Sequence, residues 1–429
     1  MKLSKHKTIK TLLVLIVFQW GQIEAKKFDT LKNKFIELDL PQVQLDFKNV
    51  LNTHVDDSRR NKQSAKIDQL LMKSKAVNIK NQCEKIILSK IVFDLKVHKL
   101  RNNLLGQYHA NPSKYSGSIN DLPNSKQWYR LLTQRWLGED VSATELQRIG
   151  ENEFVLAKKE FDRVKKIISK KDITTASSNS KIIKKAYKQA EKTVMKNLQT
   201  LFANEWRFKA VTIEKSTLGN NFPAPGYYNL DTETFYFNPL KDNYNLSQVD
   251  WLFIHEAVPG HHYQNKISEQ YGMCKGNQVT QTEMAFTEGW AAYTETLGQQ
   301  LQLFQDENSY YFALKWQVLR AMRVIIDVGI HAQGWSVKQA EQYWLDRFPE
   351  GQDIMAREIK RIQRWPMQVN TYVYGKYKIE QLKKHLQQLQ GKNFNVKAFH
   401  KNIISLSQLP LASIKDYQIL FLNNMEKTP

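Results

Sequence analysis

Residues 255–262 read His-Glu-Ala-Val-Pro-Gly-His-His, and the fold prediction for the chain starts from this stretch. The usual zinc-peptidase signature, H-E-x-x-H, places two imidazoles at i and i+4 on one helix face, with a glutamate beside the first. Here Pro259 occupies i+4, and the next imidazoles come at i+6 and i+7. On a regular helix of ~100° per residue, i+6 lies ~240° round the axis and i+7 lies ~10 Å along it, so neither could share a metal with His255.

The Pro259-Gly260 pair can interrupt the regular helix and so change this geometry. Proline removes a backbone donor and clashes with the preceding turn, while glycine accepts almost any dihedral, so a break there returns His261 towards His255. The alternative is a helix that ends at Pro-Gly and is followed by solvated histidines. The stretch therefore predicts an interrupted metal-binding helix, with Glu256 as a general base beside it, and leaves that alternative open.

A second segment, residues 286–295, reads Phe-Thr-Glu-Gly-Trp-Ala-Ala-Tyr-Thr-Glu and predicts a helix. Glu288, Ala292 and Glu295 fall on one face of it, at i, i+4 and i+7. A carboxylate from a following helix completes the three protein ligands of some zinc sites and leaves the fourth position open for water. Glu288 is therefore the candidate third ligand. The alternative is that both glutamates solvate an amphipathic helix.

The apolar run from residue 310 to 334 carries four ionisable groups that line an arc of ~80° on one helix. These groups are Arg320, Arg323, Asp327 and His331. Buried charges persist only when they are paired or face a polar cavity. One interpretation is an internal ion-pair network, with Arg323 bonded to Asp327 at i and i+4. The other directs Arg320 and Arg323 at a substrate and lets His331 hydrogen-bond an oxyanion.

Aromatic residues flank a polar turn between residues 227 and 239, which predicts a β-hairpin. An edge strand beside a metal site commonly pairs with an extended peptide, and this pairing tolerates many sequences. Tyr236, in the second aromatic run, is therefore a candidate substrate contact. The alternative is a small hairpin that covers only the core.

Four stretches carry a resemblance to a known family: H-E-A-V-P-G-H-H at 255–262, F-T-E-G-W-A-A-Y-T-E at 286–295, L-R-A-M-R-V-I-I-D-V-G-I-H at 319–331 and W-P-M-Q-V-N-T-Y-V-Y-G at 365–375. With further landmarks at 122–129 and 227–238, nearly the whole mature chain resembles the bacterial domain of unknown function 885 family. Members of that family look like helical zincins. The resemblance implies one zinc ion per chain, held by His255, His261 and Glu288, with Glu256 as general base. Whether His261 or the neighbouring His262 is the second ligand stays open.

The last of these stretches departs from the family pattern, because Pro366-Met367-Gln368 stands where the family has P-G-Q. Tyr372 nevertheless stays in register. We expect Tyr372 or His331 to stabilise the tetrahedral oxyanion of the reaction. The other interpretation of Tyr372 is a packed aromatic residue at the start of a helix.

Length and composition favour a mainly α fold. The 429 residues are 41% hydrophobic with only 11 Pro and 17 Gly, and residues 145–169 and 181–207 have helical periodicity. We predict a large multi-helix, zincin-like metallopeptidase architecture with a small β-hairpin or sheet near the active site. The expected regions are a signal peptide (1–25), an N-terminal helical region (26–175) and a helical catalytic region (176–429). The softest boundary is the Ser/Thr-rich segment 170–181.

The N-terminus predicts export. Lysines precede the apolar residues 11–18, and Ala25 ends a cleavage site, which is the pattern of a signal peptide. The apolar core is too short for a comfortable transmembrane span, and no later stretch approaches 18 apolar residues. We therefore expect the protein in the periplasm or beyond, with no transmembrane segment. In that compartment Cys83 and Cys274 either form a disulfide or stay as buried thiols.

The net charge of +21 introduces a different class of function. A strongly basic protein can bind nucleic acid or an anionic membrane. The lysines are spread along the chain instead of forming one basic stripe, and an exported protein does not meet DNA as its main partner. We therefore expect no nucleic-acid partner, while weak contact with an anionic membrane surface stays open.

Together these features predict an exported zinc-dependent peptidase that hydrolyses short peptides by means of metal-activated water. Arg320, Arg361 and Arg364 could clamp a substrate carboxylate through bidentate bonds, which would favour carboxypeptidase or dipeptidase action. The alternatives are a catalytically degenerate zincin-like binding protein and a basic protein that binds the envelope surface. The sequence does not reveal which terminus of a peptide is recognised.

Overall fold

The computed structural model describes residues 26–413 apart from 42–43, 54–55, 80, 169–175, 206, 220–223, 240–242, 273, 275–282 and 408–409. The predicted signal peptide, residues 1–25, lies outside the described residues, as do residues 169–175 at the Ser/Thr-rich segment. The fold is mainly helical, with about 70% helix and small sheets, which confirms the mainly α prediction. In the described part of the chain, no helix combines the length and the apolarity that a membrane span needs.

Contacts between residues divide the chain into two compact units. Of the described residues, the first unit takes in those within 26–41 and 51–112, and the second those within 44–50, 113–274 and 283–413. This division does not coincide with the boundary expected at the Ser/Thr-rich segment.

The first unit holds the helical residues 26–36 and two long helices, α3 (Asp57–Ser74) and α4 (Gln82–Ala110), while α2 (Phe47–Asn52) crosses the border between the units. Each long helix begins at a side-chain cap, which satisfies backbone N–H groups that have no partner within the helix. The Asp56 carboxylate accepts a hydrogen bond from Ser58 N, and the Asn81 side chain accepts from Cys83 N and Glu84 N. α3 and α4 pack against each other through buried aliphatic side chains.

The second unit contains the remaining helices and the described strands. Its helices are α5 (Ser125–Leu137), α6 (Ala143–Lys165), α7 (Ser180–Asn197), α8 (Val249–Glu256), α9 (His261–Tyr271), α10 (Met284–Glu295), α11 (Glu307–Ala332), α12 (Val337–Arg347), α13 (Gln352–Arg364), α14 (Asn370–Gln390) and α15 (Val396–Ser405). Its strands are β1 (Ala176–Ser177), β2 (Thr212–Lys215), β3 (Gly226–Asn229), β4 (Thr234–Phe237) and β5 (Tyr244–Asn245).

α7 ends earlier than the helix predicted up to residue 207. A 3₁₀ turn at Leu198–Thr200 follows it, and Asn197 Nδ2 donates to Thr193 O at 2.8 Å. An asparagine that bonds its own backbone competes with further helical hydrogen bonds. This local competition is the physical reason for the early end.

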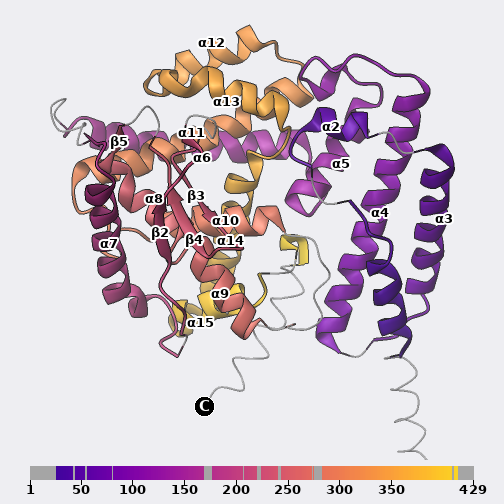
Figure 1. Ribbon diagram of the computed structural model, residues 1–429, viewed down its shortest axis with the longest axis horizontal. Helices are drawn as coiled ribbons and strands as arrows, with labels where there is room; N and C mark the ends of the chain where they lie inside the picture. Colours follow the sequence, from indigo (N-terminus) through magenta and orange to yellow (C-terminus); the bar gives the residue numbers. More distant parts are fainter. Residues whose placement is uncertain are drawn as a thin grey trace, which may run out of the picture. The chain divides into compact units, whose positions relative to one another are not determined.

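α11 is the most extensively packed helix of the second unit, in contact with α6, α12, α13 and α14 (Figure 1). Met322 and Ile325 of α11 are completely buried in one core with Phe161 of α6 and Trp344 of α12. The apolar run recognised in the sequence is thus a core helix, and its ionisable side chains must find partners within the fold.

The aromatic hairpin is present as predicted. β3 pairs antiparallel with β4, so that Tyr227 lies opposite Tyr236, and β2 adds to the other side of β4 in parallel. The order β2-β4-β3 leaves β3 at the edge of this sheet. β3 also contacts α8 (Figure 1), so the edge strand adjoins the helix that carries His255 and Glu256.

α10 and α14 cross with their backbones in contact at Gly289 and Gly375. A Cβ on Gly289 would lie 2.3 Å from Gly375 Cα, and a Cβ on Gly375 would lie 1.8 Å from Ala285 O. A larger residue therefore fits at neither position. Because Glu288 precedes Gly289, and Tyr372 lies about one turn before Gly375, this crossing sets the relative positions of the two side chains.

The two cysteines are not free thiols. Cys83 and Cys274 are both disulfide-bonded, which decides between the alternatives left open by the sequence.

Candidate functional site

The helix that begins the motif is interrupted at the Pro-Gly pair, as predicted. α8 ends at Glu256, and α9 starts at His261. A Cβ on Gly260 would lie 1.8 Å from His255 O, so a glycine is needed for the chain to turn back this closely. The Trp290 indole of α10 donates to Pro259 O at 2.8 Å and so fixes the connection against the next helix.

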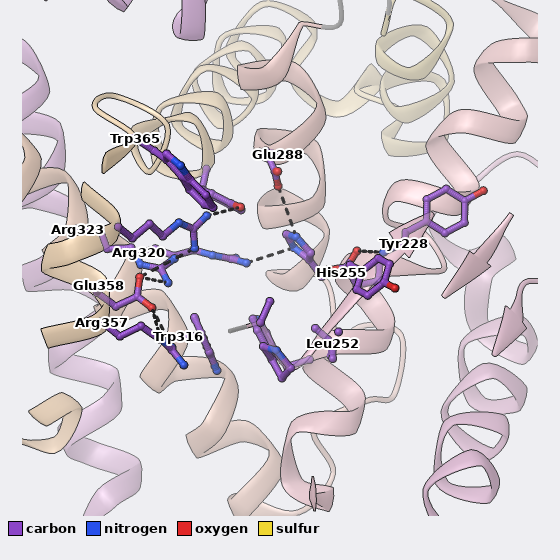
Figure 2. A pocket seen from close by; sticks show the side chains of 18 of the residues that line it. Tyr228, Leu252, His255, Glu288, Trp316, Arg320, Arg323, Arg357, Glu358 and Trp365 are labelled. Atoms are coloured by element: carbon purple, nitrogen blue, oxygen red, sulfur yellow. Dashed lines mark hydrogen bonds and ion pairs between the residues drawn. The ribbon is translucent and has the colours of Figure 1, made fainter. Parts of the chain in front are cut away.

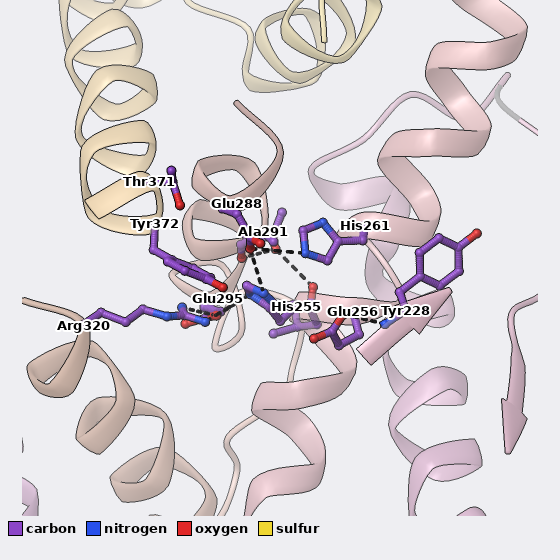
Figure 3. A network of polar contacts seen from close by, with 12 residues as sticks. Tyr228, His255, Glu256, His261, Glu288, Ala291, Glu295, Arg320, Thr371 and Tyr372 are labelled. Carbon is purple, nitrogen blue, oxygen red and sulfur yellow. Dashed lines mark hydrogen bonds and ion pairs between the residues drawn. The ribbon is translucent and has the colours of Figure 1, made fainter. Parts of the chain in front are cut away.

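The interruption brings three predicted metal ligands together. One ligand atom each from His255, His261 and Glu288 lies within 4.8 Å of the others. Glu288 Oε2 is 3.7 Å from His255 Nε2 and 3.5 Å from His261 Nε2. Figure 3 shows Glu288 facing both rings. Two imidazole nitrogens and one carboxylate oxygen are a donor set that zinc favours, so these residues fit the predicted metal.

His262 points elsewhere. Its side chain is fully buried, with Nε2 2.7 Å from Lys209 O and Nδ1 3.1 Å from the Tyr228 hydroxyl. Both ring nitrogens are therefore engaged outside the ligand cluster. Of the two neighbouring histidines, the structure places His261 with His255 and Glu288.

The charges of the cluster shift its protonation equilibria. Burial and Arg320 lower the pKa of His255, but hydrogen bonds with Glu288 and Glu295 outweigh them and raise this pKa to about 9. Burial would raise the pKa of Glu288, but its hydrogen bonds with His255 and His261 outweigh burial and lower this pKa well below its usual range. The acidic side chains thus favour positive charge at His255, which either a proton or a metal ion can supply.

Glu295 contacts the ring nitrogen of His255 that faces away from Glu288. His255 Nδ1–H donates to Glu295 Oε1 at 2.7 Å, and Glu295 is only 1% exposed. Glu295 also forms a buried ion pair with Arg320, whose guanidinium stacks over the Tyr372 ring, 4.9 Å from its centroid. A carboxylate on the second ring nitrogen fixes the tautomer and orientation of a ligand histidine. The alternative that Glu295 solvates a helix is therefore wrong, and its i+7 spacing from Glu288 was the available signal.

Glu256 lies beside the ligand cluster at the end of α8. Its Oε2 accepts a hydrogen bond from Tyr228 N of β3 at 2.9 Å (Figure 3). Burial raises the pKa of Glu256, and the nearby Glu288 carboxylate raises it further, against the lowering effect of His255 and His261. A carboxylate with a raised pKa can both accept and return a proton.

The cluster opens into a cavity of about 430 Å³. Figure 2 shows Tyr228 and His255 on one side of it and the arginines of α11 and α13 on the other. The lining residues that carry charge or an aromatic ring are Tyr227, Tyr228, Trp251, His255, Glu256, His261, Glu288, Trp316, Arg320, Arg323, Arg357, Glu358, Lys360, Arg361, Arg364, Trp365 and Tyr372.

Only two of the three candidate substrate contacts line this cavity. Arg320 and Arg323 line it, whereas Tyr236 is not among its lining residues. Tyr236 instead stacks on Tyr227, with ring centroids 5.2 Å apart, and Tyr227 and Tyr228 of the edge strand face the cavity. The hairpin was predicted correctly from the sequence, but the chosen residue, Tyr236, lies on the central strand β4 and not on the edge strand β3.

His331 is also away from the cavity. Its Nδ1 accepts from Ile119 N at 3.2 Å, and its Nε2 donates to Ile362 O at 3.0 Å. Burial lowers the pKa of His331, and it outweighs the opposing charge of Asp327, so the ring is held neutral. A neutral imidazole with both nitrogens engaged holds backbone segments together, and this placement does not support the expected oxyanion role.

The expected ion pair between Arg323 and Asp327 is replaced by partners from other elements. Arg323 Nη2 lies 2.7 Å from Glu358 Oε2 of α13. Asp327 accepts from Met367 N at 2.9 Å and from Asn370 Nδ2 at 2.8 Å. The i,i+4 spacing permitted the pair, but Glu358 of α13, the backbone N–H of Met367 and the side chain of Asn370 in α14 are better placed as partners.

Comparison with known proteins identifies a family and a fold. A family model described as "Bacterial protein of unknown function (DUF885)" matches residues 39–417. A search of curated proteins finds no match.

Solved structures resemble the chain at low sequence identity. A crystal structure described as a "putative lipoprotein" from Colwellia psychrerythraea superimposes with a TM-score of 0.65 at 16% identity, over 88% of this chain and 72% of that one. A "putative lipoprotein of unknown function" from Shewanella oneidensis gives a TM-score of 0.54 at 19% identity, over 87% and 69%. At such identities the likeness concerns the fold.

Proposed function

The chain belongs to this family of bacterial proteins of unknown function, and we propose, from the site itself, that it is a zinc-dependent peptidase that hydrolyses short peptides. The observation that carries the proposal is the convergence of His255, His261 and Glu288 within 4.8 Å, beside the buried carboxylate of Glu256 and open to a cavity. Three protein ligands with an open position are typical of catalytic zinc sites, whereas structural sites are closed by four. The zincin-like character of the site belongs to the same proposal.

Zinc held by these three residues would lower the pKa of water and polarise a substrate carbonyl. Glu256 would accept the proton of the attacking water and later donate it to the leaving amine. Its raised pKa suits both steps, because a group that alternates between acid and base works best with a pKa near the working pH. Tyr228 N, bonded to Glu256 Oε2, would keep the carboxylate in place during both transfers.

Tyr372 is the proposed donor to the oxyanion. It lines the cavity, and its ring lies over that of His255 with centroids 6.1 Å apart. Burial raises the pKa of Tyr372, as does the charge of Glu288, so the hydroxyl stays protonated and can donate. Arg361 Nη2 lies 3.5 Å from this hydroxyl and adds positive charge where negative charge would develop.

The edge strand supplies a docking surface for the peptide backbone. Asn238 N donates to Pro225 O, and hydrogen-bonded residues alternate along an antiparallel ladder, so the backbones of Gly226 and Tyr228 face away from β4. Both residues line the cavity. The Tyr228 N–H is bonded to Glu256, so an extended peptide laid along β3 would pair with the other outward-facing backbone groups, irrespective of its sequence. A cavity of about 430 Å³ would admit a short peptide and exclude a folded chain.

We also propose that the protein acts after export. The signal-peptide pattern of residues 1–25 supports this, and the two solved relatives described as lipoproteins agree with it.

Metal analysis combined with cleavage of a defined peptide mixture tests the function. The wild-type protein should hold about one zinc per chain, His255→Ala should lose it, and the exposed His385→Ala should retain it. Glu256→Gln should keep fold and zinc but lose turnover by about 10²- to 10⁴-fold, because an amide cannot accept the proton. Equal zinc in all variants together with no cleavage would instead favour a binding protein.

A further inference from the structure

The proposed chemistry uses one group of charges in the cavity only through Arg361. Three guanidiniums surround the single carboxylate of Glu358: Glu358 Oε2 lies 2.7 Å from Arg323 Nη2 and 4.0 Å from Arg361 Nη1, and Glu358 Oε1 lies 2.8 Å from Arg357 Nη2. All four residues line the cavity. We call residues 323, 357, 358 and 361 the arginine cluster, and Figure 2 shows Arg323, Arg357 and Glu358 on the opposite side of the cavity from Tyr228.

The arginine cluster has more positive charge than its own carboxylate balances. Arg323 and Glu358 are only 3% and 2% exposed, so water screens their charges weakly. Burial lowers the pKa of Arg323 to about 10, since Arg361 and Arg320 add to its effect and Glu358 opposes it only in part. Lys360 and Arg364 add further positive charge to the same wall. An anion entering the cavity would relieve this repulsion.

The cluster is also prepared to donate hydrogen bonds. The buried Nε–H groups of Arg323 and Arg361 have no hydrogen-bond partner among the described residues. Arg323 lies over the Trp316 ring at 5.4 Å and Arg361 over the Trp365 ring at 5.5 Å, which holds the planar side chains in place. Fixed guanidinium planes match the fork geometry of a carboxylate.

We propose that the arginine cluster is an anion subsite that binds a carboxylate of the peptide substrate while the scissile bond lies at His255, His261 and Glu288. This inference rests on the proposed peptidase function, because the two sites share one cavity. A short peptide offers two such groups, its C-terminal carboxylate and an acidic side chain. The protein would accordingly trim carboxylate-bearing peptides instead of cutting neutral, blocked ones.

Three matched peptides distinguish the sources: one with a free C-terminus and no acidic side chain, its C-terminal amide, and an amide that carries one glutamate. Their binding to Glu256→Gln is measured by calorimetry, and their turnover by the wild type gives kcat/KM. The free acid should bind and react about 10- to 100-fold better than the plain amide, as expected for the loss of a charge-assisted contact. If the amide that carries a glutamate regains the binding and turnover of the free acid, a side-chain carboxylate can also occupy the subsite.

Arginine variants locate the subsite. Arg357→Gln should reduce the preference for the free acid several-fold and leave the plain amide nearly unchanged in binding, and Arg361→Gln should reduce the same preference. Arg163→Gln, which removes an exposed arginine paired with Glu160 on α6, should keep the preference. If one variant does not fold, the other variant and the peptide comparison still test whether the arginine cluster binds the carboxylate.

The two proposals fail in different ways. Equal binding of acid and amide, unaffected by either arginine variant, would overturn the anion subsite even if both peptides are cleaved. Tighter binding of the acid without cleavage of any peptide would support the subsite and overturn the peptidase. Absence of binding by all three peptides would overturn the subsite.

Discussion

His255 and Glu295 are joined by a hydrogen bond of 2.7 Å between Nδ1 and a carboxylate oxygen, and this bond leaves Nε2 of the same ring facing Glu288. One ring nitrogen is thus committed to the protein interior and the other to the proposed metal. The bond links the last turn of α8 to the last residue of α10, so the geometry of the site depends on the packing of two helices.

Weakening this bond should weaken metal binding. In Glu295→Gln the charge is lost but the shape is kept, and zinc affinity should fall about 10- to 100-fold, as is typical of partners behind a ligand histidine. A competition titration against a chromophoric chelator measures the change. Glu269→Gln, on the exposed face of α9, serves as the control. Unchanged zinc affinity in Glu295→Gln would show that His255 needs no orientation by a carboxylate.

Removing the Tyr372 hydroxyl should slow the chemical step. Tyr372→Phe should lower kcat about 10²- to 10³-fold with little change in zinc content, because one donor to the developing oxyanion is lost. Steady-state kinetics on the best peptide of the mixture provides the measurement. Tyr236→Phe, outside the cavity lining, should leave kcat unchanged. If both variants behave alike, Tyr372 is a packed aromatic and not a catalytic group.

Replacing His331 should affect stability and not chemistry. His331→Ala leaves Ile119 N without its acceptor and Ile362 O without its donor, and it opens a void in the core. We expect a loss of about 2–5 kcal/mol in the free energy of unfolding. Urea denaturation measures it, while activity per folded molecule should stay near the wild-type value. A fall in activity comparable to that of Glu256→Gln would restore a catalytic role for His331.

Acid should destabilise the fold through His400. Its Nδ1 donates to Leu201 O and its Nε2 accepts from the Tyr293 hydroxyl, and burial lowers its pKa to about 3 from an ordinary value of 6.5. Below pH 6.5 the unfolded chain takes up a proton that the folded chain refuses. Stability is therefore complete above this pH and falls as the pH drops towards 3. At pH 4.5 His400 should lower the free energy of unfolding by about 2–3 kcal/mol, compared with its value above pH 6.5.

The comparison that isolates His400 uses metal-free protein at pH 7.5 and 4.5. His400→Gln should lose less stability between the two pH values than the wild type, whatever its stability at pH 7.5, and the exposed His385→Gln should match the wild type. An identical acid loss in His400→Gln would mean that this residue is protonated without cost in the folded protein.

The features that sequence could predict are those that short-range geometry decides. The Pro259-Gly260 pair breaks the helical hydrogen-bond pattern locally, and the aromatic runs on either side of the polar turn at residues 231–234 favour a hairpin. Glu288 could be predicted as the third ligand because it lies on a helix that follows the histidine motif. In the first two cases the decisive residues lie close together in the chain, whereas Glu288 was chosen from the pattern of a second helix.

The remaining features depend on which elements meet in space. Arg323 bonds Glu358, which lies 35 residues further along the chain, and no periodicity within α11 indicates that partner. Tyr227 and Tyr236 are opposite one another in the hairpin, so either could have faced the substrate until the packing of β3 on α8 decided it. His331 shares a helix face with Arg320, yet its neighbours are Ile119 and Ile362.

The crossing at Gly289 and Gly375 has a consequence for how such a protein can diversify. Glu288 and Tyr372 sit on the two helices that meet there, whereas Arg357 and Arg361 sit on α13. The reacting centre and most of the recognition wall are therefore carried by different helices, and the crossing at the reacting centre admits no larger residue. Relatives can acquire new substrate preferences by changes on α13 while the spacing at the reacting centre stays constant.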